Sequence, residues 1–308
     1  DAPVAPKFDH PGVEVIEGKI AGTPDSSPGM DGIPYALYRA WGLEGAQFLD
    51  WIVRNITEGK MAPIPTNLLV WIPKAAAGLS ADNWRPLDMP TTWVRIISGA
   101  VLWKVAEEWP DAIHQSQTLV GSFKEPHANY RDTQDQLNQA GGEGSLKGVL
   151  LADLAKAFEW LHPQWIIKCL KVREAPKWLI RFVTWLLTNR TSCTKIRNQL
   201  IQMLMRPRGI DMGNGLSPWL FCIAIDPMIR LLNKVPRLMS MKAYMDDTNT
   251  MGTGLRWITK VQEIYDMFEC MGLKTVKHTC ISKTFRDKKD KIQRTHSDSI
   301  IKGLQGMA

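Results

Sequence analysis

The stretch that decides the fold is Lys242-Ala243-Tyr244-Met245-Asp246-Asp247-Thr248-Asn249-Thr250. Its two ends favour strands and its centre favours a tight turn, so the stretch predicts a β-hairpin with Asp246 and Asp247 at its tip. Neighbouring side chains of a regular strand point to opposite faces, whereas a turn lets two adjacent carboxylates converge on one point. Such a pair suits hard divalent cations such as Mg²⁺. Taken alone, the motif is also compatible with an ordinary solvated turn.

A third acidic residue follows an apolar run much earlier in the chain. Gly148-Val149-Leu150-Leu151-Ala152 predicts a buried strand that ends on Asp153. Three carboxylates from two such elements can hold two Mg²⁺ ions roughly 3.5–4 Å apart, the geometry of nucleotidyl transfer. Alone, Asp153 is better explained as the N-cap of a helix that begins near Leu154. Together with the hairpin, it favours a catalytic site.

The composition narrows the class of protein. The chain has 308 residues, a net charge of +7 and 44% apolar residues, which allows a sizeable core and excludes a disordered chain. A basic balance is typical of proteins that bind nucleic acid, although a solvated basic surface explains it equally well. The apolar stretches are too short to span a membrane, so we expect no membrane partner. The five cysteines and six histidines have neither disulfide-framework nor zinc-site spacing.

The rest of the pattern predicts helices separated by a few strands, and hence the α+β class. Helical spacing covers residues 33–59, 91–109, 163–170, 176–188, 218–232 and 261–271, and a further strand is expected at 68–72. Residues 1–29 are rich in Pro and Gly, and we expect them to form a loose leader.

In combination, the motifs resemble the reverse transcriptases of non-LTR (LINE-type) retrotransposons. Asp153-Leu-Ala-Lys-Ala-Phe158-Glu is similar to their first palm motif, and Tyr244-Met-Asp-Asp247 is similar to their catalytic hairpin. Further matches follow in family order. Ser27-Pro28-Gly29-Met30-Asp31-Gly32-Ile33-Pro34 is similar to the N-terminal extension motif. The fingers motifs are matched by Ile72-Pro73-Lys74 with Asn83-Trp84-Arg85-Pro86-Leu87 and, more weakly, by residues 117–123, and the middle palm motif by residues 208–221.

The resemblance implies the fingers and palm of a right-hand polymerase, an α+β fold with an antiparallel palm sheet backed by helices. The implied domains are a leader at 1–25, the N-terminal extension and fingers at 26–147, the palm at 148–282, and a basic tail at 283–308 that begins an incomplete thumb. The implied enzyme is an RNA-directed DNA polymerase, a nucleotidyltransferase that uses two Mg²⁺ (or Mn²⁺) ions to add dNMP to a primer 3′-hydroxyl.

The resemblance also assigns roles to individual residues. The catalytic residues and metal ligands would be Asp153, Asp246 and Asp247, with the backbone carbonyl of Leu154 facing the same metal. The nucleotide-binding residues would be Lys74, Arg85, Phe158, Met212 and Gly213. The nucleic-acid-binding residues would be Ser217, Pro218, Tyr244, Lys283, Lys288 and Lys289.

Two of these roles have a clear physical basis. Phe158 would be the steric gate, because a bulky ring there clashes with the 2′-hydroxyl of a ribonucleotide. Arg85 would grip the triphosphate, because a planar guanidinium suits phosphate oxygens. Without the motif, Phe158 is compatible with an ordinary core position. Lys74 is equally compatible with a cation on the surface of the fingers.

Three positions depart from the family pattern. Met212 replaces the usual Gln and offers no hydrogen-bond donor, Asn214 stands where Asp is common, and Val276 replaces the usual Asn. Met212, Val276 and the missing thumb support an alternative, a decayed or repurposed domain that binds nucleic acid without catalysis. The three carboxylates oppose that alternative. An RNA polymerase with the same palm is a further alternative, which Phe158 disfavours.

The expected partners are an RNA template, a DNA or RNA primer and dNTP, while protein partners cannot be inferred. The basic run at 283–294 is either a solvated face or a strip that tracks phosphates. We expect an intracellular location. The nucleus is compatible with it, but Lys288-Lys289 is too short to count as a nuclear signal.

Overall fold

The computed structural model describes residues 2–60, 62–73, 83–118, 131–133, 135–136, 146–188, 190–196, 199–202, 207–254, 256–284 and 291–296. The chain divides into two compact units. The first unit consists of Asp1–Ala2, Asp111–Leu161 and Cys222–Ala308, and the second of Pro3–Pro110 and His162–Phe221. The domain limits expected from the sequence stay predictions.

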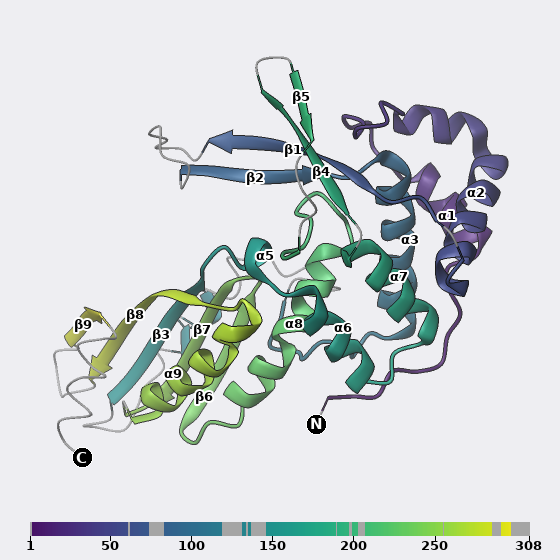
Figure 1. Ribbon diagram of the computed structural model, residues 1–308. Coiled ribbons are helices and arrows are strands. Elements are labelled where there is room, and N and C mark those ends of the chain that lie inside the picture. Colours follow the sequence, from purple (N-terminus) through teal and green to yellow (C-terminus); the bar gives the residue numbers. More distant parts are fainter. Residues whose placement is uncertain are drawn as a thin grey trace. The chain divides into compact units, whose positions relative to one another are not determined.

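A five-stranded antiparallel sheet forms the centre of the first unit (Figure 1). Its strands, in spatial order, are β6 (Leu238–Tyr244), β7 (Asp247–Thr253), β3 (Leu146–Leu154), β8 (Thr275–Thr284) and β9 (Lys291–His296). The expected hairpin and the expected strand before Asp153 are therefore neighbours in one sheet. This arrangement confirms the antiparallel palm sheet that the motifs predict.

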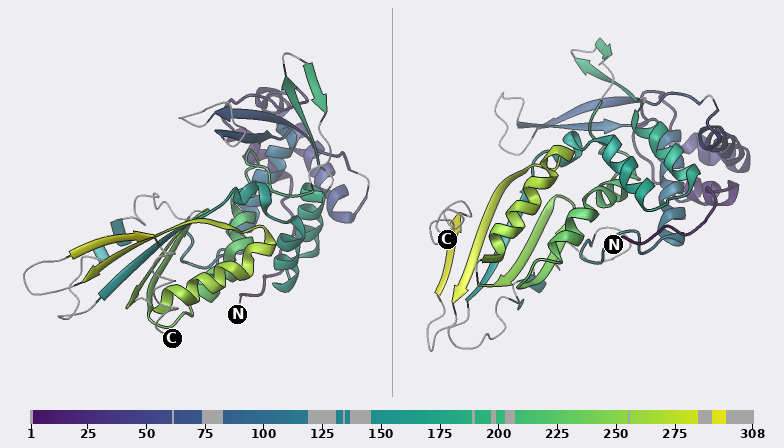
Figure 2. Two further views of the ribbon diagram at one scale, coloured as in Figure 1. Left: turned by 60° about the vertical axis from the view of Figure 1, so that its left-hand side comes forward. Right: turned by 60° about the horizontal axis from the view of Figure 1, so that its bottom comes forward.

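Helices cover one face of this sheet. Helix α9 (Arg256–Phe268) and the C-terminal part of α8 (Ser217–Leu232) run along it, as Figure 2 shows from two further directions. Helix α9 presents a continuous apolar stripe that includes Trp257, Val261 and Phe268, all of them buried. At Gly252 of β7, the indole nitrogen of Trp257 would lie 2.7 Å from an added Cβ, so the strand needs a glycine where the helix packs.

The second unit combines helices with a four-stranded sheet of order β2-β1-β4-β5. Its helices are α1 (Val13–Ala21), α2 (Tyr35–Glu58, kinked at Gly42), α3 (Thr92–Glu108), α6 (Pro163–Val172) and α7 (Lys177–Thr188). Its strands are β1 (Thr66–Pro73), β2 (Trp84–Met89), β4 (Thr191–Ile196) and β5 (Gln199–Gln202). Strand β1 pairs with β2 in antiparallel and with β4 in parallel orientation.

Several features of the fold differ from the sequence-based expectation. Residues 1–29 do not form a loose leader throughout, because Val13–Ala21 are helical and bury Ile16 and Ile20. The apolar spacing of this short helix is obscured by the surrounding prolines and glycines. Strand β9 (Lys291–His296) extends the sheet of the first unit, so part of the expected basic tail is a strand.

Strand β2 also went unrecognised. Pro86 argues against a strand because proline cannot donate to a β-ladder, but β2 is an edge strand, where proline is tolerated. Within the described part of the chain, no helix is long and apolar enough to cross a membrane.

Candidate active site

The acidic hairpin joins β6 to β7 through a two-residue turn. Tyr244 and Asp247 pair across the strands, which leaves Met245 and Asp246 as the turn itself. Met245 has a φ of +54°, a left-handed conformation that is uncommon for a residue other than glycine. Backbone strain of this kind is concentrated at functional sites, where the surrounding structure holds it in place. The predicted hairpin is confirmed, with Asp247 as the first residue of β7 rather than part of the turn.

The third carboxylate lies directly beside the hairpin. The register of β3 and β7 sets Asp153 opposite Asp247, and the backbone N–H of Leu154 donates to the carbonyl of Asp246 at 3.3 Å. Directly opposite residues on antiparallel strands have Cβ atoms about 4.5–5.5 Å apart and share a face of the sheet. Asp153 therefore lies within a strand and is not the N-cap of a helix, since helix α5 (Ala157–Trp160) begins only at Ala157.

A bulge adjusts the backbone at this point. The register between β3 and β8 shifts between Asp153 and Leu154. Bulges bend a strand and re-aim its side chains, and they are over-represented next to active sites. The backbone N–H of Ala155 then donates to the carbonyl of Lys274 at 2.7 Å, which fixes the chain just beyond the bulge.

The carboxylates of the hairpin and of β3 differ in exposure and bring like charges together. Asp153 and Asp247 are exposed and Asp246 is half-buried. Partial burial raises the pKa of the Asp247 carboxyl, and the negative charge of Asp153 raises it further. Carboxylate oxygens are hard donors and suit Mg²⁺, an ion that keeps several of its own waters. Within the described residues, however, no three His, Cys, Asp or Glu side chains are close enough to form a complete metal cage.

A buried hydrogen-bond chain lies next to the pair formed by Asp153 and Asp247. The hydroxyl of Thr248 donates to the carbonyl of Ala152 at 3.3 Å, and it also contacts the hydroxyl of Tyr265. Either hydroxyl of this pair can donate to the other. Complete burial raises the pKa of Tyr265 to about 12, so the phenol keeps its proton. Ala152 and Thr248 pair with each other immediately beside the Asp153–Asp247 pair.

Sequence reasoning missed this support. The helical spacing over residues 261–271 places Tyr265 on an apolar face but does not indicate a partner for its hydroxyl. The signal that could have found it is general: a tyrosine on a buried helical face needs a hydrogen-bond partner for its polar end.

Phe158, the predicted steric gate, lies on α5 and is half-buried. The end of the same helix, at Trp160, packs against the turn around Gly272, which has a φ of +89°. An added Cβ at Gly272 would clash with the carbonyl oxygen of Trp160, so only glycine allows this close approach. The role of Phe158 itself stays a prediction.

The remaining nucleotide-binding residues that the structure describes lie in the second unit. Gly213 donates its backbone N–H to the carbonyl of Asp88 at 3.0 Å, and an added Cβ would clash with the same oxygen. Gly213 therefore packs closely against the backbone of Asp88, and its role in nucleotide binding stays a prediction. Met212 is half-buried, and Arg85 is exposed on the edge strand β2.

Asn214 has a structural role in the same loop. Its side-chain amide donates to the hydroxyl of Ser98 at 3.1 Å, and its carbonyl oxygen accepts from the backbone N–H of Leu216 at 2.9 Å. These two contacts give a local reason for an asparagine at this position. Nearby, the buried guanidinium of Arg190 pairs with Asp211 and holds the start of the loop.

The predicted nucleic-acid-binding residues are divided between the units. Tyr244 is half-buried at the end of β6, whereas Ser217 is buried and Pro218 half-buried at the start of α8. Lys283 belongs to β8, but its side chain lies outside the described part of the chain. Lys74, Lys288 and Lys289 also lie outside the described residues.

An antiparallel sheet with an acidic hairpin beside an acidic strand end defines the palm class of polymerase folds. The sequence model of the family "Reverse transcriptase (RNA-dependent DNA polymerase)" matches residues 72–300, so the chain belongs to this family. Over 256 residues it is 23% identical to a Xenopus laevis protein described as "Transposon TX1 uncharacterized 149 kDa protein". That alignment covers 79% of the chain but only 20% of the relative's length.

The fold is also similar to a solved structure of apo telomerase from Candida tropicalis, truncated from its C-terminal domain. The TM-score is 0.54 at 13% sequence identity, and the match covers 82% of this chain and 60% of the telomerase chain. At this level of identity, the likeness supports the fold alone. Together with the transposon relative, the family match confirms the resemblance to retrotransposon reverse transcriptases.

Proposed function

We propose that the chain contains the fingers and palm of a retrotransposon reverse transcriptase, an RNA-directed DNA polymerase that transfers dNMP to the 3′-hydroxyl of a primer. One observation carries the proposal. The β3–β7 register sets Asp153 opposite Asp247 and beside the turn that holds Asp246. Carboxylates gathered in this way serve metal-dependent nucleotidyl transfer. Membership of the family supplies the expectation that the template is RNA and the product DNA.

The three carboxylates and the carbonyl of Leu154 would hold two Mg²⁺ or Mn²⁺ ions. Once bound, these ions supply the charge that activates the primer hydroxyl and stabilises the leaving pyrophosphate. The β-ladder and the buried Tyr265–Thr248 contact keep the acidic pair in register without a metal. Because the protein supplies this order in advance, a bound cation need not rearrange the strands.

Other residues would select and orient the nucleotide. Phe158 would exclude the 2′-hydroxyl of a ribonucleotide by clash, which favours dNTP. Arg85, with Lys74, would grip the triphosphate. Gly213 keeps its loop close to Asp88, and Met212 next to it would face the nucleotide sugar without a hydrogen-bond donor.

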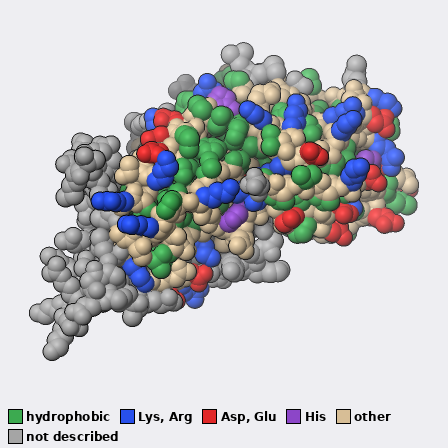
Figure 3. Space-filling view, turned by 90° about the horizontal axis from the view of Figure 1, so that it is seen from below, with side chains coloured by type: hydrophobic (Ala, Val, Ile, Leu, Met, Phe, Trp, Pro, Cys, Tyr) green, Lys and Arg blue, Asp and Glu red, His purple; other side chains and the backbone are tan. Residues whose placement is uncertain are grey.

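The nucleic-acid partners would be an RNA template and a DNA or RNA primer, bound mainly through their phosphates. The chain carries a net charge of +7. On the face seen in Figure 3, Lys and Arg side chains are spread among acidic and apolar ones. Binding on that face would therefore use separate phosphate contacts rather than one concentrated patch. We also propose an intracellular location, where RNA templates and dNTP are available.

Primer extension on poly(rA)/oligo(dT), with Mg²⁺ or Mn²⁺ and with either dTTP or UTP, tests the proposal. We expect extension with dTTP and little with UTP. A clear preference for UTP would support the RNA polymerase alternative instead. Tight template–primer binding with no extension by either nucleotide would support the decayed domain, to which Met212 and Val276 point.

A further inference from the structure

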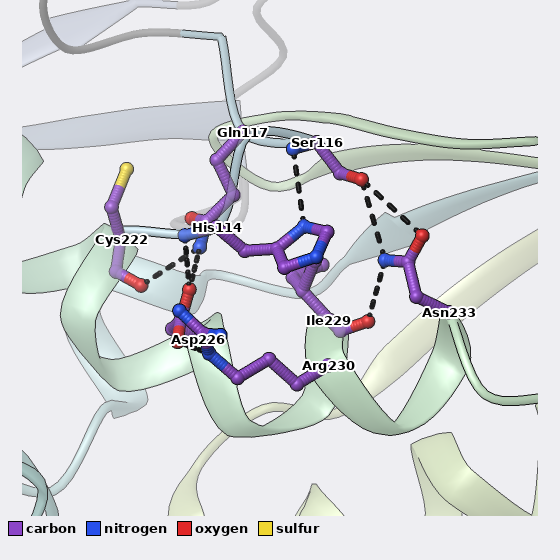
Figure 4. A network of polar contacts seen from close by, with 8 residues as sticks. All are labelled: His114, Ser116, Gln117, Cys222, Asp226, Ile229, Arg230 and Asn233. Atoms are coloured by element: carbon purple, nitrogen blue, oxygen red, sulfur yellow. Dashed lines mark hydrogen bonds and ion pairs between the residues drawn. The ribbon is translucent and has the colours of Figure 1, made fainter. Parts of the chain in front are cut away.

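A buried carboxylate outside the candidate active site organises a separate polar network in the first unit (Figure 4). Asp226 of α8 is completely buried. Its side chain accepts hydrogen bonds from the backbone N–H of His114 at 2.6 Å, from the amide of Gln117 at 3.0 Å and from the guanidinium of Arg230 at 2.5 Å. A buried charge is tolerated only when it is paired and hydrogen-bonded, and Asp226 meets both conditions.

The network fixes the segment from His114 to Thr118 against α8 at several points. The amide of Gln117 also donates to the carbonyl of Cys222 at 3.2 Å, and the hydroxyl of Ser116 contacts the amide group of Asn233 at 3.3–3.4 Å. The backbone N–H of Ser116 donates to Nδ1 of His114 at 3.2 Å. Burial and the charge of Arg230 lower the pKa of His114 and outweigh the charge of Asp226, which raises it, and this favours the neutral imidazole that accepts the bond.

The same segment also pairs with β6, the first strand of the acidic hairpin. The backbone N–H of Ala243 donates to the carbonyl of Ser116 at 2.8 Å, and the N–H of Thr118 donates back to the carbonyl of Ala243 at 3.1 Å. Gln117 and Ala243 make a parallel bridge. Ala243 directly precedes Tyr244 and the strained turn, and β6 is the edge strand of its sheet. The segment therefore covers the edge on which the turn is built.

We propose that Asp226 is a positioning residue for the candidate active site: it fixes the segment 114–118, which in turn holds β6 and the Met245–Asp246 turn in register. An edge strand paired on one side only opens easily, and opening here would move Asp246 away from Leu154. The positive charge of Arg230 neutralises the Asp226 carboxylate, and its hydrogen bond fixes the position of the second carboxylate oxygen. The consequence for nucleotidyl transfer rests on the proposed function, whereas the consequence for hairpin order does not.

Hydrogen exchange followed by mass spectrometry tests the proposal on the full chain. Asp226→Asn keeps the shape of the side chain but places an amide donor against Arg230. We expect exchange in the hairpin peptides (residues 238–253) to accelerate about tenfold relative to α9 of the same unit. Gln117→Leu removes two side-chain bonds while keeping the backbone bridge, and should act in the same direction. This second variant keeps the test decisive if Asp226→Asn does not fold.

Asp50→Asn is the matched control. Asp50 of α2 is also buried and accepts from the guanidinium of Arg54, four residues later, at 2.6 Å, but it lies in the second unit. We expect this control to leave hairpin exchange and Mn²⁺ affinity, measured by electron paramagnetic resonance, unchanged. The two test variants should weaken Mn²⁺ binding several-fold.

If Asp226→Asn accelerates exchange in the hairpin no more than in α9, or if Asp226→Asn and Asp50→Asn bind Mn²⁺ equally well, the assignment is overturned. Hydrogen exchange requires neither metal nor polymerase activity. A parent protein that extends no primer would therefore refute the proposed function and leave this test intact.

Discussion

Replacing Gly213 by alanine tests the packing of the loop in the second unit. The new Cβ would clash with the carbonyl oxygen of Asp88 and also contact Pro90 at 3.4 Å. Backbone must move to relieve this overlap, and overpacking of a fitted site costs about 1–3 kcal/mol. The movement also disrupts the hydrogen bond from Gly213 to Asp88, worth about 0.5–1.5 kcal/mol. We therefore expect Gly213→Ala to lower the free energy of unfolding by about 2–4 kcal/mol.

The assay is urea unfolding followed by tryptophan fluorescence, with Gly215→Ala as the control. Gly215 lies two residues further along the same loop, is exposed, and has its nearest neighbour, Cα of Gly99, at 4.0 Å from an added Cβ. The control should be neutral or stabilising by up to about 1 kcal/mol. If the two variants unfold at the same urea concentration, the steric argument for Gly213 is refuted.

Three further experiments test the first unit. Asp247→Asn should raise the melting temperature at pH 7 and lose this advantage as the pH falls towards 3.8. The reason is that a carboxyl with a raised pKa destabilises the folded state only at pH values where the group is charged. An unchanged melting temperature at pH 7 would contradict the repulsion from Asp153. In a double-mutant cycle of unfolding free energies, Tyr265→Phe and Thr248→Val should couple by about 1 kcal/mol, and additive effects would mean that their contact contributes nothing. Phe158→Val should raise the ratio of kcat/KM for UTP to that for dTTP, and a constant ratio would return Phe158 to a core role.

Much of the candidate site can be predicted from local sequence. Short-range patterns indicate the hairpin that places Asp246 in its turn and Asp247 at the start of the next strand. Asp153 follows an apolar run of strand length. The pairing that brings Asp153 opposite Asp247 is different, because it joins residues 94 positions apart, 153 and 247, and depends on the register of the folded sheet. Only the order of family motifs suggested it.

The supporting residues could not be predicted for the same reason. Asp226 lies in an apolar helix, and nothing nearby in the sequence indicates that His114 and Gln117 would be its partners. Strand β9 was hidden because a charged run is typical of a solvated surface, whereas strand pairing uses backbone groups whatever the side chains. Tertiary contacts decided these features.

The most direct test of the central claim measures extension and template–primer binding on the same samples of Asp246→Asn. Asp266→Asn is the control, because Asp266 is exposed on α9 and contacts Gln262 rather than the site. We predict that Asp246→Asn abolishes dTTP extension on poly(rA)/oligo(dT). Its affinity for template–primer should stay within about twofold of the parent, because phosphate contacts carry that affinity. The control should extend and bind like the parent. Extension by Asp246→Asn at the parent rate would contradict the assignment of this hairpin as the catalytic centre.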